Sequence, residues 1–257
     1  MSAHLIPRPI SPAVVAAALV EGWRQLWRCP KPALGFAGIF VLIGLLIFAV
    51  LLRFDLDPMM LPFAGGFLLV GPAVLGGFIA LRRAGEAGHR PGMGHVLTAF
   101  RSAPRGLWVI AGVCALLFLI WISDAATVFS FMIGMGTAPQ SGQVLRFHAF
   151  TGVMGAVLAL IVFCISAFSV PLLFDRRATL VGAVAASVKA VFVNPGAMLV
   201  WGFVLAVAVI LTILCPPLLV LSLPCLAFAS DLIYLEIFPP DQGLPDTSSL
   251  VQDCHGR

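Results

Sequence analysis

The stretch PALGFAGIFVLIGLLIFAVLL, Pro32–Leu52, contains no charged side chain. About 20 helical residues, each rising about 1.5 Å, cross the roughly 30 Å of hydrocarbon in a bilayer. The run is longer than the apolar part of a signal peptide, and no small-residue cleavage site follows it. It therefore predicts a transmembrane helix that is retained as a membrane anchor.

The composition extends this prediction to the whole chain. Of its 257 residues, 61% are hydrophobic and 10% are charged, and the mean hydropathy is +1.08. Soluble domains carry about 25% charged residues, which cover their surface. The charge available here is too small for that, so a soluble fold is excluded. The net charge of +4 is divided among short segments between apolar runs, which gives no indication of a nucleic-acid partner.

Six apolar runs are long enough to cross a bilayer, and they predict an all-α, polytopic transmembrane helical bundle. Proline ends one helix and can open another, so Cys215-Pro216-Pro217 predicts a tight corner between the last two spans. The six predicted spans are Ala33–Leu52, Met59–Leu81, Leu107–Ala126, Phe150–Phe174, Gly196–Cys215 and Leu218–Ile237.

Lysine and arginine are distributed unevenly about these spans. If the N-terminus lies inside, all but two of the 15 basic residues fall on the inner side; the exceptions are Arg53 and Arg146. Basic residues are enriched in cytoplasmic loops. We therefore expect a multi-pass protein with both termini in the cytoplasm, comprising an N-terminal segment (1–31), a transmembrane domain (32–238) and a disordered cytoplasmic tail (239–257).

Amphipathic segments precede three of the spans, at Pro12–Arg28, Met93–Arg101 and Leu180–Val193. In the first segment, Trp23 and Trp27 share a helical face with aliphatic residues, whereas Arg24 and Arg28 lie on the opposite face. A helix of this kind lies flat among lipid headgroups. We therefore expect these four residues at the membrane interface.

The amphipathic segments also indicate an internal repeat of a two-span unit. In each unit a surface helix with a basic residue is followed by a proline that opens a span. The openings are Arg24…Pro30, Arg101…Pro104 and Lys189…Pro195. The second span of each unit carries an internal proline, at Val70-Gly71-Pro72, Ser169-Val170-Pro171 and Ser222-Leu223-Pro224, which predicts helix breaks or close packing at Gly71, Pro72, Pro171 and Pro224.

Charged residues inside a membrane are costly and are therefore functional candidates. Asp231 lies about 20 Å from the outer end of the last span, counted along the helix, and Asp124 lies near the outer end of the third. Asp231 has two interpretations: a protonated or hydrogen-bonded carboxyl near Ser230 or Tyr234, or a group that handles ions or protons. An interfacial position accounts for Asp124.

Glycines divide the second span at Gly65-Gly66, Gly71 and Gly76-Gly77. Small residues allow close helix packing in lipid. A broken helix that lines a transport cavity is the alternative. Since no polar residue accompanies these glycines, packing is the favoured interpretation.

No cofactor or metal is expected. The histidines lie outside the spans or at their ends, whereas a haem held in a bilayer usually needs ligands on spanning helices. The six cysteines form no CxxC pair, and most lie inside apolar runs, where a thiol packs as a small apolar group.

Several short sequences resemble a bacterial family of predicted integral membrane proteins, domain-of-unknown-function family 2189. They are Gly22-Trp23-Arg24, Pro62–Phe67 with Gly71-Pro72, Val170–Arg176 and Asn194–Gly202. The resemblance extends from about Val14 to Ile237 and implies six spans in a bacterial inner membrane. Relatives end the last span with a histidine-containing stretch, which this chain replaces with Ala227–Glu236. The resemblance implies no activity.

Three classes of function remain. The leading hypothesis is a non-enzymatic accessory or organising subunit of a larger membrane complex, with lipid and other membrane subunits or further copies of itself as partners. A small-solute channel or transporter that uses Asp231 and the glycine-broken second span is the alternative. A membrane enzyme is disfavoured, because no nucleophile–base pair or metal-ligand set is recognisable.

Overall fold

The computed structural model describes residues 5–69, 71–132 and 141–240, and all regular structure within them is helical, which confirms the all-α prediction. The predicted tail is described only as far as residue 240, so 241–257 lie outside the described residues. The helices are α1 (Pro12–Arg28), α2 (Pro30–Arg53), η1 (Asp57–Met59), α3 (Met60–Leu69), α4 (Gly71–Glu86), α5 (Met93–Arg101), α6 (Arg105–Met132), α7 (Ser141–Ser166), α8 (Ser169–Phe174), α9 (Leu180–Val193), α10 (Pro195–Leu214), η2 (Pro216–Leu218) and α11 (Leu219–Ile237).

Five helical segments in the described part of the chain are long and apolar enough to cross a membrane: Pro30–Arg53, Arg105–Met132, Gly142–Phe174, Pro195–Leu214 and Pro216–Ile237. They correspond to five of the six predicted spans. The predicted span Met59–Leu81 covers α3 and most of α4 and includes residue 70, which lies outside the described residues, so the count of six stays a prediction.

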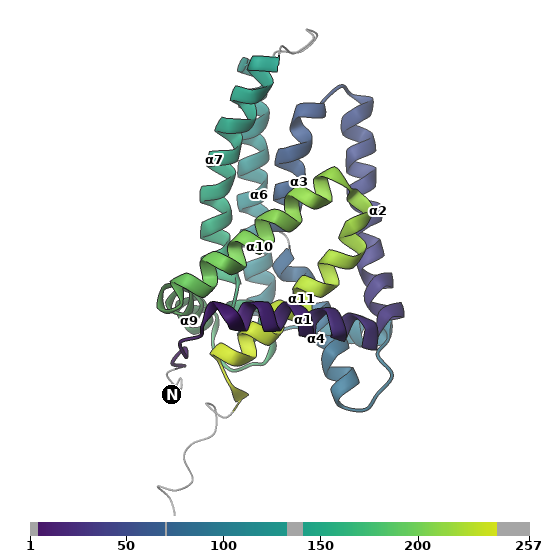
Figure 1. Ribbon diagram of the computed structural model, residues 1–257, viewed down its shortest axis with the longest axis vertical. Helices are drawn as coiled ribbons and strands as arrows, with labels where there is room; N and C mark the ends of the chain where they lie inside the picture. Colours follow the sequence, from purple (N-terminus) through teal and green to yellow (C-terminus); the bar gives the residue numbers. More distant parts are fainter. Residues whose placement is uncertain (1–4, 70, 133–140, 241–257) are drawn as a thin grey trace, which may run out of the picture.

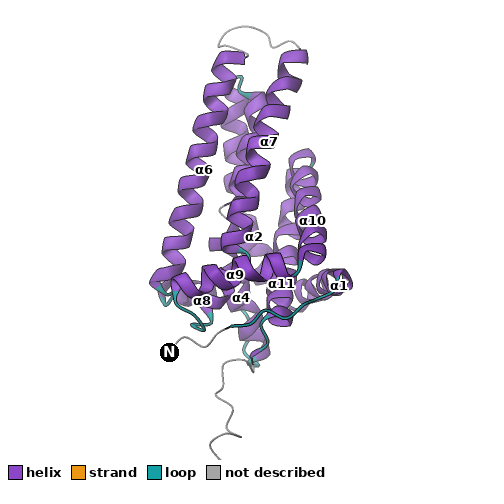
Figure 2. Cartoon of the chain, turned by 90° about the vertical axis from the view of Figure 1, so that its left-hand side faces the viewer, coloured by secondary structure: helices purple, strands orange, loops and turns teal. Residues whose placement is uncertain are grey.

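The long helices α6 and α7 stand side by side, and α2 runs beyond α3, whereas α1 and α9 lie across one end of the bundle, at the bottom of Figures 1 and 2. We call this end the base. The three helices α1, α5 and α9 have the bounds predicted for the amphipathic segments. Helices α10 and α11 meet at the predicted proline corner, where η2 begins at Pro216, and α11 runs back down to α1.

Helix α1 packs on α11 through a small residue. A Cβ atom at Gly22 would lie 2.6 Å from the carbonyl oxygen of Cys225 and 2.9 Å from the amide nitrogen of Ala229. The two backbones are therefore in direct contact, as small residues allow in membrane proteins. Trp23 and Trp27 are exposed beside this contact, and their rings meet edge to face with centroids 5.7 Å apart.

The charged side chains on the polar face of α1 pair with one another. Arg24 and Arg28 both reach the carboxylate of Glu21, at 3.3 and 3.0 Å. Such exposed pairs contribute little to stability. They nevertheless leave the aromatic pair and the arginines on the outer surface of α1, as an interfacial helix requires.

The proline of the fourth predicted span marks a real break. Helix α7 ends at Ser166, and α8 begins at Ser169 with Pro171 in its first turn. The buried hydroxyl of Ser187, on α9, accepts a hydrogen bond from the Phe168 amide at 3.2 Å and donates one to the Cys164 carbonyl at 2.8 Å. Backbone groups freed by a break in an apolar setting need such partners. Pro224, by contrast, lies inside α11 and is buried.

Asn194 holds the N-terminal segment against the base. Its side-chain oxygen accepts a hydrogen bond from the Ile10 amide at 2.6 Å, and its amide nitrogen donates to the Arg8 carbonyl at 3.2 Å. The amide of Arg8 donates to the carbonyl of Ile237 at 3.0 Å. Asn194, which precedes α10, therefore holds a segment that is distant in the sequence. It is separated from Ile10 by 184 positions.

The order of elements recurs along the chain. A surface helix is followed at once by a long apolar helix at α1–α2, α5–α6 and α9–α10. This order agrees with the predicted two-span unit. The threefold repeat itself stays a prediction.

Candidate functional site

Asp231 is buried, as predicted, but its partner is not the one we expected. The carboxyl group is 1% exposed and accepts a hydrogen bond from the Nε of Arg82, on α4, whose side chain is 7% exposed. Ser230 and Tyr234 were the expected neighbours on α11. Instead, an arginine 149 positions away supplies the compensating charge that a buried carboxylate requires.

Arg82 has a second carboxylate partner. Its Nη1 lies 2.5 Å from Oε1 of Glu86, one helical turn further along α4, and that side chain is 61% exposed. One arginine thus connects a buried acid to an acid at the surface. The Oδ1 atom of Asp231 is buried without a hydrogen-bond partner among the described residues.

A second ion pair lies beside the first. Arg83 pairs with Asp175, which follows α8, and its guanidinium lies 5.0 Å from the ring centroid of Phe174. Tyr234 donates a hydrogen bond to Oδ2 of Asp175 at 2.6 Å. The tyrosine selected from the sequence therefore binds Asp175 and not Asp231.

Arg177 completes the network at the C-terminal end of α11. Its Nη1 donates to the Tyr234 oxygen at 3.2 Å and to the Phe238 carbonyl at 2.7 Å, and its Nη2 donates to the Pro239 carbonyl at 2.6 Å. The ionic cluster, as we call it, joins α4, the turn after α8 and the end of α11. It consists of Arg82, Arg83, Asp175, Arg177, Asp231 and Tyr234.

The turn after α8 directs three consecutive side chains to different partners. The Arg176 amide donates to the carbonyl of Leu173, and the Arg177 amide donates to that of Leu172, the two bonds of a Schellman ending. Arg176 occupies the left-handed position of this motif, with φ of 54°, where glycine is usual. Asp175 then faces α4 and α11, while Nη2 of Arg176 donates to the Ser102 carbonyl at 3.3 Å.

Arg83 remains charged despite its burial. Desolvation lowers the pKa of Arg83, which lies beyond the predicted end of the second span. An arginine nevertheless keeps its proton at any physiological pH. The cluster can therefore position helices by charge without exchanging protons at the arginines.

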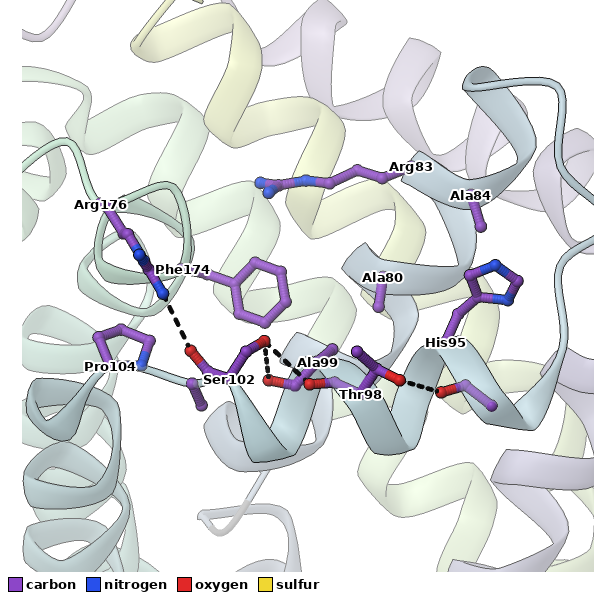
Figure 3. Close-up of a pocket in the computed structure, with 12 residues that line it drawn as sticks. Ala80, Arg83, Ala84, His95, Thr98, Ala99, Ser102, Pro104, Phe174 and Arg176 are labelled. Atoms are coloured by element: carbon purple, nitrogen blue, oxygen red, sulfur yellow. Dashed lines mark hydrogen bonds between the residues drawn. The ribbon is translucent and has the colours of Figure 1, made fainter.

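A pocket of about 580 Å³ opens beside the cluster, between α4, α5 and the turn after α8. Figure 3 shows the Arg83 side chain above the Phe174 ring, Arg176 to the left of the ring and His95 to its right. The volume of the pocket is in the range of small-molecule sites. No group of three or more histidine, cysteine, aspartate or glutamate side chains that could hold a metal is found in the part of the chain that the structure describes.

Asp124 is not part of this site. It is half-buried on α6, about 28 Å along the helix from its first residue. Among the described glycines of the second span, Gly77 meets a neighbour most closely, since a Cβ there would lie 2.5 Å from the ring of Phe36. That contact supports close packing at Gly77.

The basic half of the cluster was not predicted from the sequence. Arg82, Arg83 and Arg177 were used only to assign the inner side of the membrane, and Asp175 was noted only as part of a family resemblance. A usable signal exists: a lone acid inside a span needs a cation, and Arg82-Arg83 directly follow a predicted span.

Residues 60–175 match a family described as "Predicted integral membrane protein (DUF2189)". Over these residues the chain is similar to that family. The match covers the part from α3 to Asp175, so it includes Arg82 and Arg83 but not Asp231 or Tyr234 on α11. The resemblance is thereby confirmed for less of the chain than the expected range from Val14 to Ile237. No curated protein and no solved structure matches the chain significantly.

Proposed function

We propose that this integral membrane protein is a non-enzymatic accessory or organising subunit of a larger membrane complex. The ionic cluster supports this proposal, because its charged side chains pair with one another. Buried ion pairs are best attested as devices that select one arrangement of helices. Here they hold α4, the turn after α8 and α11 together at the base.

The apolar outer surface of α10 is the part of the bundle that lipid or a neighbouring subunit would cover. Leu199 and Phe203 are 75% and 70% exposed, whereas Trp201, between them, is buried. Residues three and four positions apart lie on one helical face. The helix therefore has a distinct outer face, which can be probed separately from its inner one.

The experiment places a photo-crosslinking amino acid at Phe203 and, as the matched control, at Trp201, in cells at native expression. If the protein belongs to a complex, we expect a defined higher-mass product with the crosslinker at Phe203 and none with the crosslinker at Trp201. Extraction into native nanodiscs provides the second measurement, through the mass of the particle. A chain that forms no product at Phe203 and always has the mass of one copy refutes the proposal.

A small-solute channel or transporter is the second candidate. It is favoured by the Oδ1 of Asp231, which is buried without a hydrogen-bond partner among the described residues. The test is proton uptake into proteoliposomes, with Asp231→Asn compared with Glu86→Gln. A proton-coupled carrier predicts uptake that Asp231→Asn abolishes and Glu86→Gln retains. Equal uptake by both variants and the unaltered chain, above empty liposomes, rejects a role for Asp231.

We also propose a bacterial inner membrane location with both termini in the cytoplasm, supported by the uneven basic residues. Cys215, exposed at the corner between α10 and α11, would then face outward. In spheroplasts we expect an impermeant maleimide to label Cys215, and to label Cys254 only after permeabilisation. The reverse pattern overturns the orientation.

A further inference from the structure

The pocket beside the ionic cluster has the lining of an anion site. Arg83, Arg176 and His95 contribute basic groups, and Thr98 and Ser102 contribute hydroxyls. None of the described residues that line the pocket is acidic. Asp175 lies next to it but already pairs with Arg83 and accepts from Tyr234.

Arg176 is the free charge of this lining. It forms no ion pair among the described residues, and its Nη2 meets only a neutral carbonyl, that of Ser102, at 3.3 Å. Its backbone adopts the left-handed conformation, with φ of 54°. A non-glycine residue held there stores roughly 1 kcal/mol or more of strain, and such strain clusters at ligand sites. The turn thus directs an unneutralised guanidinium into the pocket, as Figure 3 shows.

The pocket lies at the level where lipid headgroups are expected. Pro104, which lines it, immediately precedes α6. Trp108, in the first turn of α6, is 55% exposed, and its ring centroid lies 6.5 Å from that of Phe100 on α5. Tryptophan concentrates at the membrane–water interface. Above Trp108, the exposed face of α6 continues through Val109, Val113 and Leu116.

We propose that this pocket binds the phosphate of an anionic glycerophospholipid, with its acyl chains along the exposed face of α6. Arg176 is the principal contact, and Arg83, His95 and the hydroxyls of Thr98 and Ser102 surround the headgroup. Basic pockets between helices on the cytoplasmic side commonly hold such headgroups. The site is independent of whether the protein belongs to a complex.

The experiment uses the full chain in detergent, titrated with short-chain phosphatidylglycerol or phosphatidylcholine and followed by native mass spectrometry. We expect phosphatidylglycerol to bind at least tenfold more tightly than phosphatidylcholine. Arg176→Ala should weaken the binding of phosphatidylglycerol about tenfold, because one charge-assisted contact is lost. Arg101→Ala is the matched control: it removes an exposed arginine of α5 that does not line the pocket. We expect it to change the affinity less than twofold.

A second variant tests the pocket without changing its charge. A Cβ at Gly94, which lines the pocket, meets no atom within 4 Å, so Gly94→Leu adds bulk at a position with open space at its Cβ. We expect this variant to weaken the binding of phosphatidylglycerol as well. Equal losses in Arg176→Ala and Arg101→Ala, or unchanged binding in both Arg176→Ala and Gly94→Leu, overturn the proposal.

The source of the phosphate is tested by competition. Glycerol phosphate carries the headgroup charge but has no acyl chains, so at equal concentration we expect it to displace little phosphatidylglycerol. Complete displacement assigns the pocket to a soluble phosphate compound and overturns the lipid assignment. Phosphatidylglycerol and phosphatidylcholine bound equally well overturn the anionic specificity.

Discussion

Replacing Asp231 with asparagine distinguishes the contributions that the two carboxylate partners of Arg82 make to stability. Breaking a buried ion pair typically costs about 3–5 kcal/mol, because the remaining charge stays buried. The asparagine amide keeps a hydrogen-bond acceptor for Nε, and Glu86 still lies 2.5 Å from Nη1. We therefore expect Asp231→Asn to lower the free energy of unfolding by about 2–3 kcal/mol.

Glu86→Gln is the matched control, because it removes the other carboxylate from the same guanidinium. That side chain is 61% exposed, and exposed pairs contribute about 0–1 kcal/mol. The double variant Arg82→Met with Asp231→Leu removes both buried charges and should lie within about 1 kcal/mol of the unaltered chain. The assay is unfolding by sodium dodecyl sulfate in mixed micelles, followed by circular dichroism. Equal losses in Asp231→Asn and Glu86→Gln, or a double variant less stable than Asp231→Asn, refute this account of the pair.

Other contacts lead to further predictions. Gly22→Ala should destabilise the protein by about 1–3 kcal/mol, since α1 must move away from the backbone of α11. Gly35→Ala, where a Cβ meets nothing within 4 Å, should be neutral or stabilising in the same unfolding assay; similar losses in both would contradict the close contact. Burial raises the pKa of the Cys29 thiol, so its thiolate fraction falls, and at pH 8 a maleimide should modify it far more slowly than the exposed Cys215, as mass spectrometry can measure. Comparable rates would show that Cys29 is accessible. Asn194→Ala should release the N-terminal segment and increase hydrogen exchange at the amide of Ile10 at least tenfold, while unchanged exchange would show that this hydrogen bond does not protect it.

The sequence predicted the elements better than their partners. Prolines and helical periodicity gave α1, α5 and α9 with the bounds that the structure has, because these signals are local. For the glycines of the second span, packing was the favoured interpretation, and at Gly77 the structure agrees with it, because Gly77 packs against Phe36.

The pairing of Asp231 with Arg82 lay beyond local reasoning, since 149 positions separate the two residues. Neighbours on α11 were the only partners that helical spacing could offer, and neither Ser230 nor Tyr234 was correct. The pocket was equally hidden, because its lining comes from α4, α5 and the turn after α8. Arg176 was noted only within the family resemblance and in the count of inner basic residues, because no side-chain pattern predicts its left-handed backbone.

Asp231 and Arg82 nevertheless share one property that the sequence shows, their depth in the membrane. Asp231 lies six positions before the end of α11, about 9 Å along the axis from the base. Arg82 follows the predicted inner end of the second span directly, and a long arginine side chain can cover such a distance while its apolar stem stays in the bilayer. The preference for basic residues on the inner side therefore places arginines where acids near the inner ends of other spans can reach them. Residues that fix the orientation of the chain are thus also candidates for its buried ion pairs, and an acid at matching depth identifies which arginines to test.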